Sequence, residues 1–314
     1  MIPTLKDKTN KAYGNIQKIE DTLNGRPFRK HRFKAAILMR KSMLVGSLLN
    51  NAKTMINITK SDLDKLEKPD IVFQKKLFDT TIKPAKAFCY LELGIKPLRY
   101  EIMEKRLSFL KYILEQKPET MMKQVYDQQR VKHKKGDFVD QVKKDKIELE
   151  MKLEDKEIKE KPKQKWKELI KRKTKEKALK DLLKENSEKT KTKDITYEDL
   201  ELSDYLKEND NTTLSNIIFS VRSGTLDIKQ WNSWSYENNL CLMCELKEET
   251  MDHFMDCQAY GTKTEDLKWK DIYKNDTKIQ YEIAKEVKKR MDIRRVKHQE
   301  AGLDSSPGSA APTL

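Results

Sequence analysis

The sequence predicts an all-α protein that carries one small metal-binding segment near its C-terminal end. Apolar residues recur at helical spacings of three and four along most of the chain, and no stretch shows the alternation of apolar and polar residues that marks a half-buried strand. The 314 residues include only nine glycines. Three of the four cysteines and one of the four histidines lie within residues 241–257.

Residues 1–120 are expected to form a first helical domain. A short helix over residues 10–24 should end at the turn signal Asn-Gly-Arg-Pro, residues 24–27. Apolar residues then recur at helical spacing over residues 33–50 and predict a helix that faces the core. This helix follows a basic stretch that contains Arg29, Lys30 and Arg32.

The same domain should contain two further helical segments. A Ser/Thr-x-x-Asp capping pattern occurs at Thr59 and again at Ser61, so a helix should begin near residue 61, and Pro69 is expected to kink or split it. Residues 98–116 predict the most clearly amphipathic helix of the chain. Its apolar face, which we interpret as plain core packing, consists of Met103, Leu107, Leu110 and Leu114.

Residues 121–195 change in composition and are expected to form a long, solvated helical linker that is rich in Lys and Glu. Within residues 161–180, ten Lys or Arg stand against two Glu. The densest point is Lys171, Arg172 and Lys173. This helix either grips phosphates or serves as a nuclear-import patch, or it is simply a solvated charged face.

Residues 196–298 regain globular character and predict a helical C-terminal domain. Two short helices should lead into the turn that begins at Arg222, and a last helix pair should follow the cysteine-rich segment. Residues 299–314, rich in Ser, Pro, Gly and Ala, are expected to be disordered.

The cysteine-rich segment has the spacing of a metal site. Cys241 and Cys244 form a C-x2-C pair, and His253 and Cys257 lie four apart, so that both can reach one ion from a single helical face. Three thiolates and one imidazole suit Zn2+ better than Mg2+ or Ca2+. We therefore expect one structural zinc ion, with no open position for catalysis. The alternative is that the thiols pack as small hydrophobic groups.

The net charge of +15, with a pI near 9.3, indicates a polyanionic partner, nucleic acid first and an anionic membrane second. The chain lacks a run of eighteen apolar residues and a signal-peptide segment, so we expect an intracellular protein, nuclear or cytoplasmic, that does not associate with membranes. Phosphate-binding loops, dinucleotide fingerprints, nucleophile elbows and metalloprotease motifs are absent from the sequence. No small-molecule substrate or catalytic activity is expected of this chain.

Several segments, in order, resemble one family. Residues 58–67, residues 91–114, and residues 219–229 followed by C-x2-C with Glu249-Thr250 before His253 are similar to the region after the polymerase palm in reverse transcriptases of non-LTR, LINE-type retrotransposons. The similarity covers roughly residues 8–260.

The resemblance implies a helical, thumb-like bundle, a charged linker and a C-terminal zinc knuckle that binds template RNA or target DNA. Thumb helices of this family contact the phosphates and sugars of a primer-template duplex, and Arg222 corresponds to a basic position before the knuckle. The palm's aromatic-x-Asp-Asp motif is absent, so this chain should not polymerise by itself. The remainder of a reverse transcriptase is an expected partner if a longer chain is expressed.

The hypothesis is therefore a non-catalytic C-terminal fragment of a LINE-type reverse transcriptase that binds RNA, DNA or their hybrid, mainly through phosphates. A rival from another class is a zinc-stapled helical scaffold, or a chromatin-associated module, that docks a protein partner. The residues expected to contact nucleic acid are Arg29, Lys30, Arg32, Lys171, Arg172, Lys173 and Arg222.

Overall fold

A computed structural model describes residues 2–25, 31–80, 82–193, 195–207, 211–236, 238–261 and 267–300. Over these residues the protein consists of helices without a strand, and a single antiparallel bridge joins Leu240 to Glu248. The prediction of an all-α fold is confirmed. Within the described ranges, none of the helices combines the length and the apolar character needed to span a membrane.

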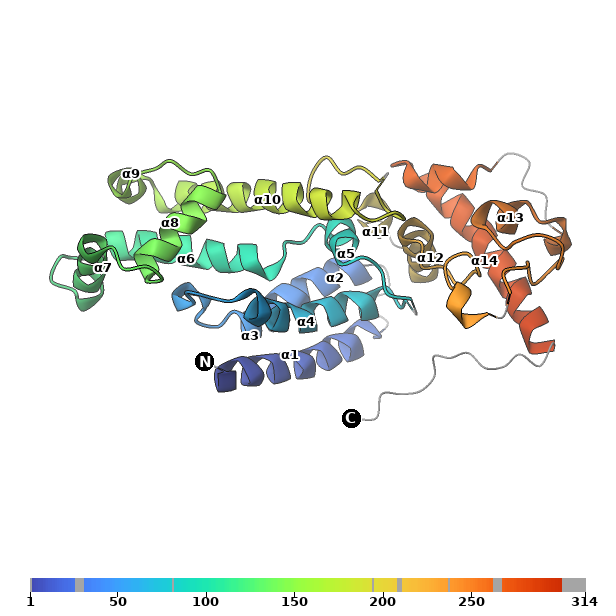
Figure 1. The fold of residues 1–314 in the computed structure, drawn as a ribbon, viewed down its shortest axis with the longest axis horizontal. Coiled ribbons are helices and arrows are strands. Elements are labelled where there is room, and N and C mark those ends of the chain that lie inside the picture. The colour runs from blue at the N-terminus through green and yellow to red at the C-terminus, as the bar shows by residue number, and fades with distance from the viewer. Residues whose placement is uncertain are drawn as a thin grey trace.

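The N-terminal helices form a layered body in the middle of an elongated molecule (Figure 1). Helix α1 is longer than expected, since it already begins at residue 2. Its buried stripe consists of Ala12, Ile16, Ile19 and Leu23. The helices of this body are α1 (Ile2–Leu23), α2 (Arg32–Met39), the π-helical segment η2 (Arg40–Val45), α3 (Gly46–Leu48), the short 3-10 helix η3 (Ala52–Thr54), α4 (Lys60–Leu77), α5 (Lys86–Leu93) and α6 (Leu98–Leu114).

Helix α4 begins where the capping pattern placed it, since the Thr59 side chain accepts a hydrogen bond from the Asp62 N–H at 3.1 Å. Of the two outcomes expected at Pro69, a kink or a split, the split does not occur, because the helix continues to Leu77. Pro69 is buried between Leu66 and Phe73 on the packed face of the helix. Tertiary packing at these positions therefore outweighs the cost of about 3 kcal/mol that an interior proline carries.

The Lys-rich segment predicted to be a solvated linker is helical as expected. One side of its longest helix, however, is packed against the rest of the protein. Helix α10 (Lys163–Ser187) lies along α6 (Figure 1), and the Trp166 indole N–H donates to the Leu107 carbonyl at 3.1 Å. Its buried residues recur every four positions and are Trp166, Ile170, Thr174, Ala178, Leu182 and Asn186. This stripe contains polar and small residues, and Lys and Glu surround it, so the hydrophobic pattern in the sequence is weak.

Three shorter helices, α7 (Met121–Lys132), α8 (Phe138–Glu148) and α9 (Asp155–Glu160), complete one end of the molecule (Figure 1). The buried Lys111 ammonium of α6 donates to the carbonyls of Ile158, Lys159 and Lys161 at the end of α9. A cation at a helix C-terminus satisfies carbonyls that the helix itself leaves unpaired.

The opposite end holds the C-terminal helices, which are α11 (Asp204–Lys207), α12 (Thr212–Ser223), the 3-10 helices η4 (Ser233–Ser235), η5 (Gln258–Tyr260) and η6 (Trp269–Tyr273), α13 (Met251–Asp256) and α14 (Thr277–Glu300). Phe219 of α12 stacks on Phe78 with ring centroids 3.6 Å apart and also contacts Phe88. Helix α12 is therefore anchored in the N-terminal core. Helix α14 includes residues 299 and 300, which were expected to be disordered, and residues 301–314 lie outside the described part.

Gly94 marks a close approach between the end of α5 and residues 201–203. It has a φ of +61°, and a Cβ there would lie 2.1 Å from the backbone carbon of Glu201. The Ser203 N–H donates to the Glu92 carbonyl at 3.0 Å, which fixes the two segments together. The left-handed conformation and the short approach both require glycine.

We expect Gly94→Ala to lower the free energy of unfolding by about 2–4 kcal/mol, because left-handed strain adds to a backbone clash. Urea denaturation followed by circular dichroism measures the loss. Gly261→Ala is the matched control, since Gly261 has a φ of +66° but no atom within 4 Å of the added Cβ. Its cost should be about 1 kcal/mol, from strain alone. Equal losses in the two variants would contradict the close approach.

Candidate metal centre and basic surfaces

The C-x2-C segment folds into a tight turn held by its own backbone. The Cys241 N–H donates to the Lys247 carbonyl at 2.7 Å, and the Glu245 N–H donates to the Cys241 carbonyl at 2.9 Å. Glu245 follows the second cysteine with a φ of +58°. These contacts turn both thiols toward the same side of the loop.

Helix α13 supplies the other two ligand candidates. The Thr250 side chain caps the helix by accepting from the His253 N–H at 3.1 Å. His253 lies in the first turn and Cys257 at the C-terminal cap, so they stand one turn apart, as their spacing predicted.

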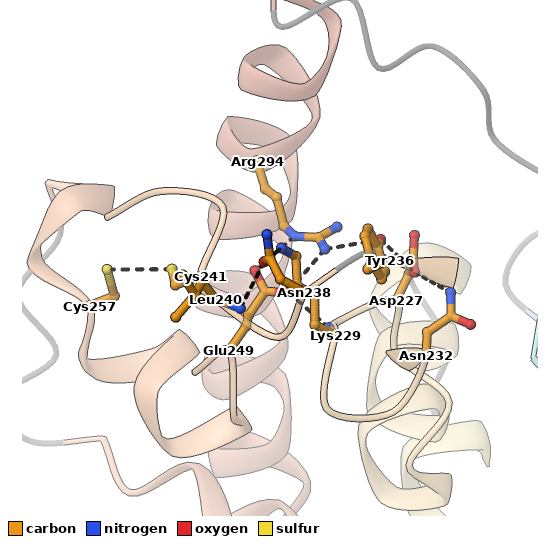
Figure 2. A network of polar contacts seen from close by, with 10 residues as sticks. All are labelled: Asp227, Lys229, Asn232, Tyr236, Asn238, Leu240, Cys241, Glu249, Cys257 and Arg294. Carbon is orange, nitrogen blue, oxygen red and sulfur yellow. Dashed lines mark hydrogen bonds and ion pairs between the residues drawn. The ribbon is translucent and has the colours of Figure 1, made fainter. Parts of the chain in front are cut away.

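The four side chains meet at one point. Their ligand atoms all lie within 4.8 Å of one another, with 3.9 Å between the Cys241 and Cys257 Sγ atoms and 3.3 Å between Cys244 Sγ and His253 Nε2. Figure 2 shows Cys241 and Cys257 facing each other. A tetrahedral ion with metal–sulfur bonds of about 2.3 Å separates its sulfur ligands by about 3.8 Å. The geometry and the donor set therefore fit one metal ion.

The thiols differ in their ionisation. Burial raises the pKa of Cys241 to about 11, although the backbone N–H groups of Cys244 and Met243 oppose this rise. Burial also raises the pKa of Cys244, but the Leu246 and Lys247 N–H groups and the His253 ring act against it more strongly, and the pKa falls to about 6. N–H groups directed at sulfur stabilise the thiolate, which is the form that binds a metal.

Two arginines of α14 stabilise the cysteine-rich segment. The Arg294 guanidinium makes a two-pronged ion pair with the buried Glu249 carboxylate, at 3.1 and 3.0 Å, and also donates to the Tyr236 hydroxyl (Figure 2). Arg290, fully enclosed, donates to the Phe254 carbonyl at 2.9 Å and to the Cys257 carbonyl at 3.3 Å. The position of Cys257 is therefore set by α14 as well as by α13.

From the sequence alone, we did not predict that Glu249, Arg290 and Arg294 support the cysteine-rich segment. In the sequence the two arginines are simply basic residues of the last predicted helix pair. The available signal was that Arg290 and Arg294 lie on the same helical face as Val287, which is buried. A charged residue in line with a buried stripe needs a partner, because an unpaired buried charge is costly.

Glu245 provides a direct stability test of the turn. Glu245→Gly should raise the free energy of unfolding by about 0.5–1 kcal/mol, because glycine removes left-handed strain at a small entropic cost. Glu248→Gly is the control, since Glu248 does not have a positive φ, and it should be neutral or destabilising. Thermal melting of the two variants measures this difference. A loss of stability in Glu245→Gly would show that the exposed Glu245 side chain matters more than its backbone.

The predicted nucleic-acid residues fall into different environments. Arg29 and Lys30 lie outside the described residues. Arg32 is half-buried and donates to the Leu23 carbonyl at 3.3 Å and to the Asn24 side chain at 3.2 Å, so it closes the end of α1. Lys171 and Arg172 are exposed on α10, and Lys173 is partly exposed.

The prediction for Arg222 is wrong. Its guanidinium is buried, pairs with the Glu92 carboxylate at 3.0 Å, and donates to the Ile272 carbonyl at 2.9 Å. Tyr197 donates to the same carboxylate at 2.6 Å. Arg222 therefore joins α12 to α5 and is not accessible to a phosphate.

The sides of α10 that are not packed carry exposed positive charge. Its exposed basic residues are Lys163, Lys165, Lys167, Lys171, Arg172, Lys180 and Lys184. Among the described residues, Arg172 has an ion-pair partner, Glu176 at 3.9 Å, and the six lysines have none. The inner face of the helix is fixed against α6, so this charge is held in place rather than carried on a free segment.

No family model, curated protein or solved structure matches this chain. Its function must therefore be inferred from its own residues and their geometry.

Proposed function

We propose that this protein binds nucleic acid mainly through phosphates, as the non-catalytic C-terminal region of a LINE-type reverse transcriptase, and that one structural Zn2+ stabilises its C-terminal end. The proposed ligands are Cys241, Cys244, His253 and Cys257. A site with four protein ligands is closed, so the zinc would have a structural role and would not activate a water.

The exposed charge of α10 is the observation that carries nucleic-acid binding. Six exposed lysines without ion-pair partners in the described part of the chain lie on a helix that is already packed. A phosphate that binds there releases counterions, and little conformational entropy is lost because the helix is preformed. The net charge of +15 supports the same conclusion.

The family assignment rests on the order of the parts. Helices that resemble a thumb come first, a Lys-rich helix follows, and the Cys3His segment comes last. We further propose that the catalytic palm domain belongs to a partner or to a longer chain. The isolated protein is accordingly proposed to bind nucleic acid without incorporating nucleotides.

A salt-titrated binding assay tests this function. Fluorescence anisotropy with a labelled RNA–DNA hybrid should show an affinity that falls with salt. The logarithm of the binding constant should fall linearly with the logarithm of the salt concentration, with a slope of about 0.7–0.9 per phosphate contacted. Replacing Lys163, Lys167, Lys171 and Lys180 by Gln should weaken binding and lower the slope. Lys152→Gln/Lys156→Gln, two exposed lysines near α9, is the control that should leave both unchanged. Absent or salt-insensitive binding would contradict the proposal and favour the protein-scaffold alternative.

A further inference from the structure

A groove of about 520 Å3 lies between η3, α6 and α10. Four lysines from the three elements line it: Lys53 from η3, Lys105 from α6, and Lys167 and Lys171 from α10. All four are exposed, and none makes an ion pair with a residue in the ranges that the structure describes. Segments far apart in the sequence thus bring unpaired positive charge to one concave surface.

The acidic side chains of the groove leave this charge largely uncompensated. Glu104 pairs with Lys96 and accepts a hydrogen bond from the Thr174 hydroxyl at 2.5 Å. Glu101 is the other acidic lining residue, and it is partly buried. Four ammonium groups therefore face the Glu101 carboxylate, which makes no ion pair with any of them.

The floor of the groove is apolar and partly aromatic. Ile170 and Leu49 are buried beneath it, and the partly exposed Phe109 ring lines it. The Lys53 ammonium lies 4.9 Å from the centre of that ring. Tyr112 is 49% exposed, and its ring centroid lies 6.0 Å from that of Phe109, with the two ring planes nearly parallel. The aromatic surface therefore continues along α6.

This combination distinguishes between classes of nucleic acid. A duplex presents phosphates and sugars while its bases remain stacked inside. Its bases therefore cannot stack on an apolar, aromatic floor. A single strand exposes bases that can stack on aromatic rings while its backbone follows a positively charged groove.

We propose that this groove binds a single-stranded nucleic-acid segment, with phosphates on Lys53, Lys105, Lys167 and Lys171 and a base on Phe109. This inference rests on the proposed function and names its substrate class. Lys167 and Lys171 lie one helical turn apart, about 5–6 Å between Cβ atoms, and contact two phosphates of the same strand. Lys53 moves from the ring to a phosphate when a base stacks.

The experiment compares the zinc-loaded full chain with four variants, using a labelled 12-nucleotide single strand and a duplex of the same length. Lys53→Gln/Lys105→Gln removes groove charge without changing α10. It should weaken single-strand binding about ten-fold and lower its salt slope by about 1.4. Phe109→Leu and Tyr112→Ala should each weaken single-strand binding about five-fold or more at an unchanged slope. Lys152→Gln/Lys156→Gln, two exposed lysines that do not line the groove, is the matched charge control and should retain at least half of the affinity.

The outcomes separate the groove from the general function. If the unmodified protein binds neither oligonucleotide, the proposed function itself fails. If Lys53→Gln/Lys105→Gln weakens binding no more than the control pair does, the proposed function stands and the groove is overturned. Tighter binding of the duplex, with no effect of Phe109→Leu or Tyr112→Ala, overturns the single-strand assignment. Melting curves that match the unmodified protein confirm that each variant is folded.

Discussion

Removal of zinc is expected to unfold residues 238–261 while the N-terminal helices stay folded. Zinc binding stabilises only the segment that supplies its ligands, by an apparent free energy of about 10–16 kcal/mol in zinc-finger peptides. Helix α12 should remain protected, because Phe219 is stacked against Phe78 in the N-terminal core. Hydrogen–deuterium exchange with and without a chelator should show rapid exchange confined to the cysteine-rich segment and the part of α14 that contacts it.

Cys244→Ser should reproduce the effect of the chelator, because it removes one of the four ligands. Cys89→Ala is the matched control, since Cys89 is a buried thiol in α5 that does not belong to the cluster. It should cost about 1 kcal/mol and leave the metal in place. An equal rise in exchange over α1, α4 and the cysteine-rich segment in Cys244→Ser would contradict the local role of the metal.

The second large effect is expected from Arg294→Met, which should lower the free energy of unfolding by about 3–5 kcal/mol. The Glu249 carboxylate is fully buried and would lose its two-pronged partner (Figure 2). The Lys229 N–H, which donates to Glu249 at 2.8 Å, cannot replace a full positive charge. Chemical denaturation of the zinc-loaded protein measures the loss.

Two further variants identify its cause. Arg295→Met changes the neighbouring, exposed arginine and should be nearly neutral. Adding Glu249→Gln to Arg294→Met should recover part of the stability, because the buried charge disappears with its partner. Simple additivity of the two single changes would show that the ion pair is not the source of the effect.

The clustering of the four candidate metal ligands could be predicted from the sequence because their spacing is local. Cys241 and Cys244 share one turn, and His253 and Cys257 share one short helix, so the separation along the chain fixes most of the geometry. The support from Arg294 could not be predicted in this way, since it joins residues 45 positions apart. Charged residues in a Lys-rich helix are usually solvated, and only the packing of α14 shows which ones are buried.

The same reason explains two of the corrections in the body of the protein. Arg222 was assigned to nucleic acid by its position before the knuckle, while its actual partner, Glu92, lies 130 positions away. Helix α10 was expected to be solvated because Lys and Glu dominate its composition. Its buried stripe is recognisable only when α6 is in place, since Thr174 and Asn186 are part of it. The groove beside α10 likewise requires three elements that the sequence does not bring together.

The metal content of the purified chain tests the central claim most directly. Elemental analysis of protein purified without added metal should find one zinc per chain, and Cys257→Ser should remove it. Zinc bound at one equivalent, with the four ligands protected from thiol-reactive and histidine-reactive reagents, would support the Cys3His centre. A folded, metal-free protein that does not take up zinc, and whose exchange pattern a chelator leaves unchanged, would contradict it.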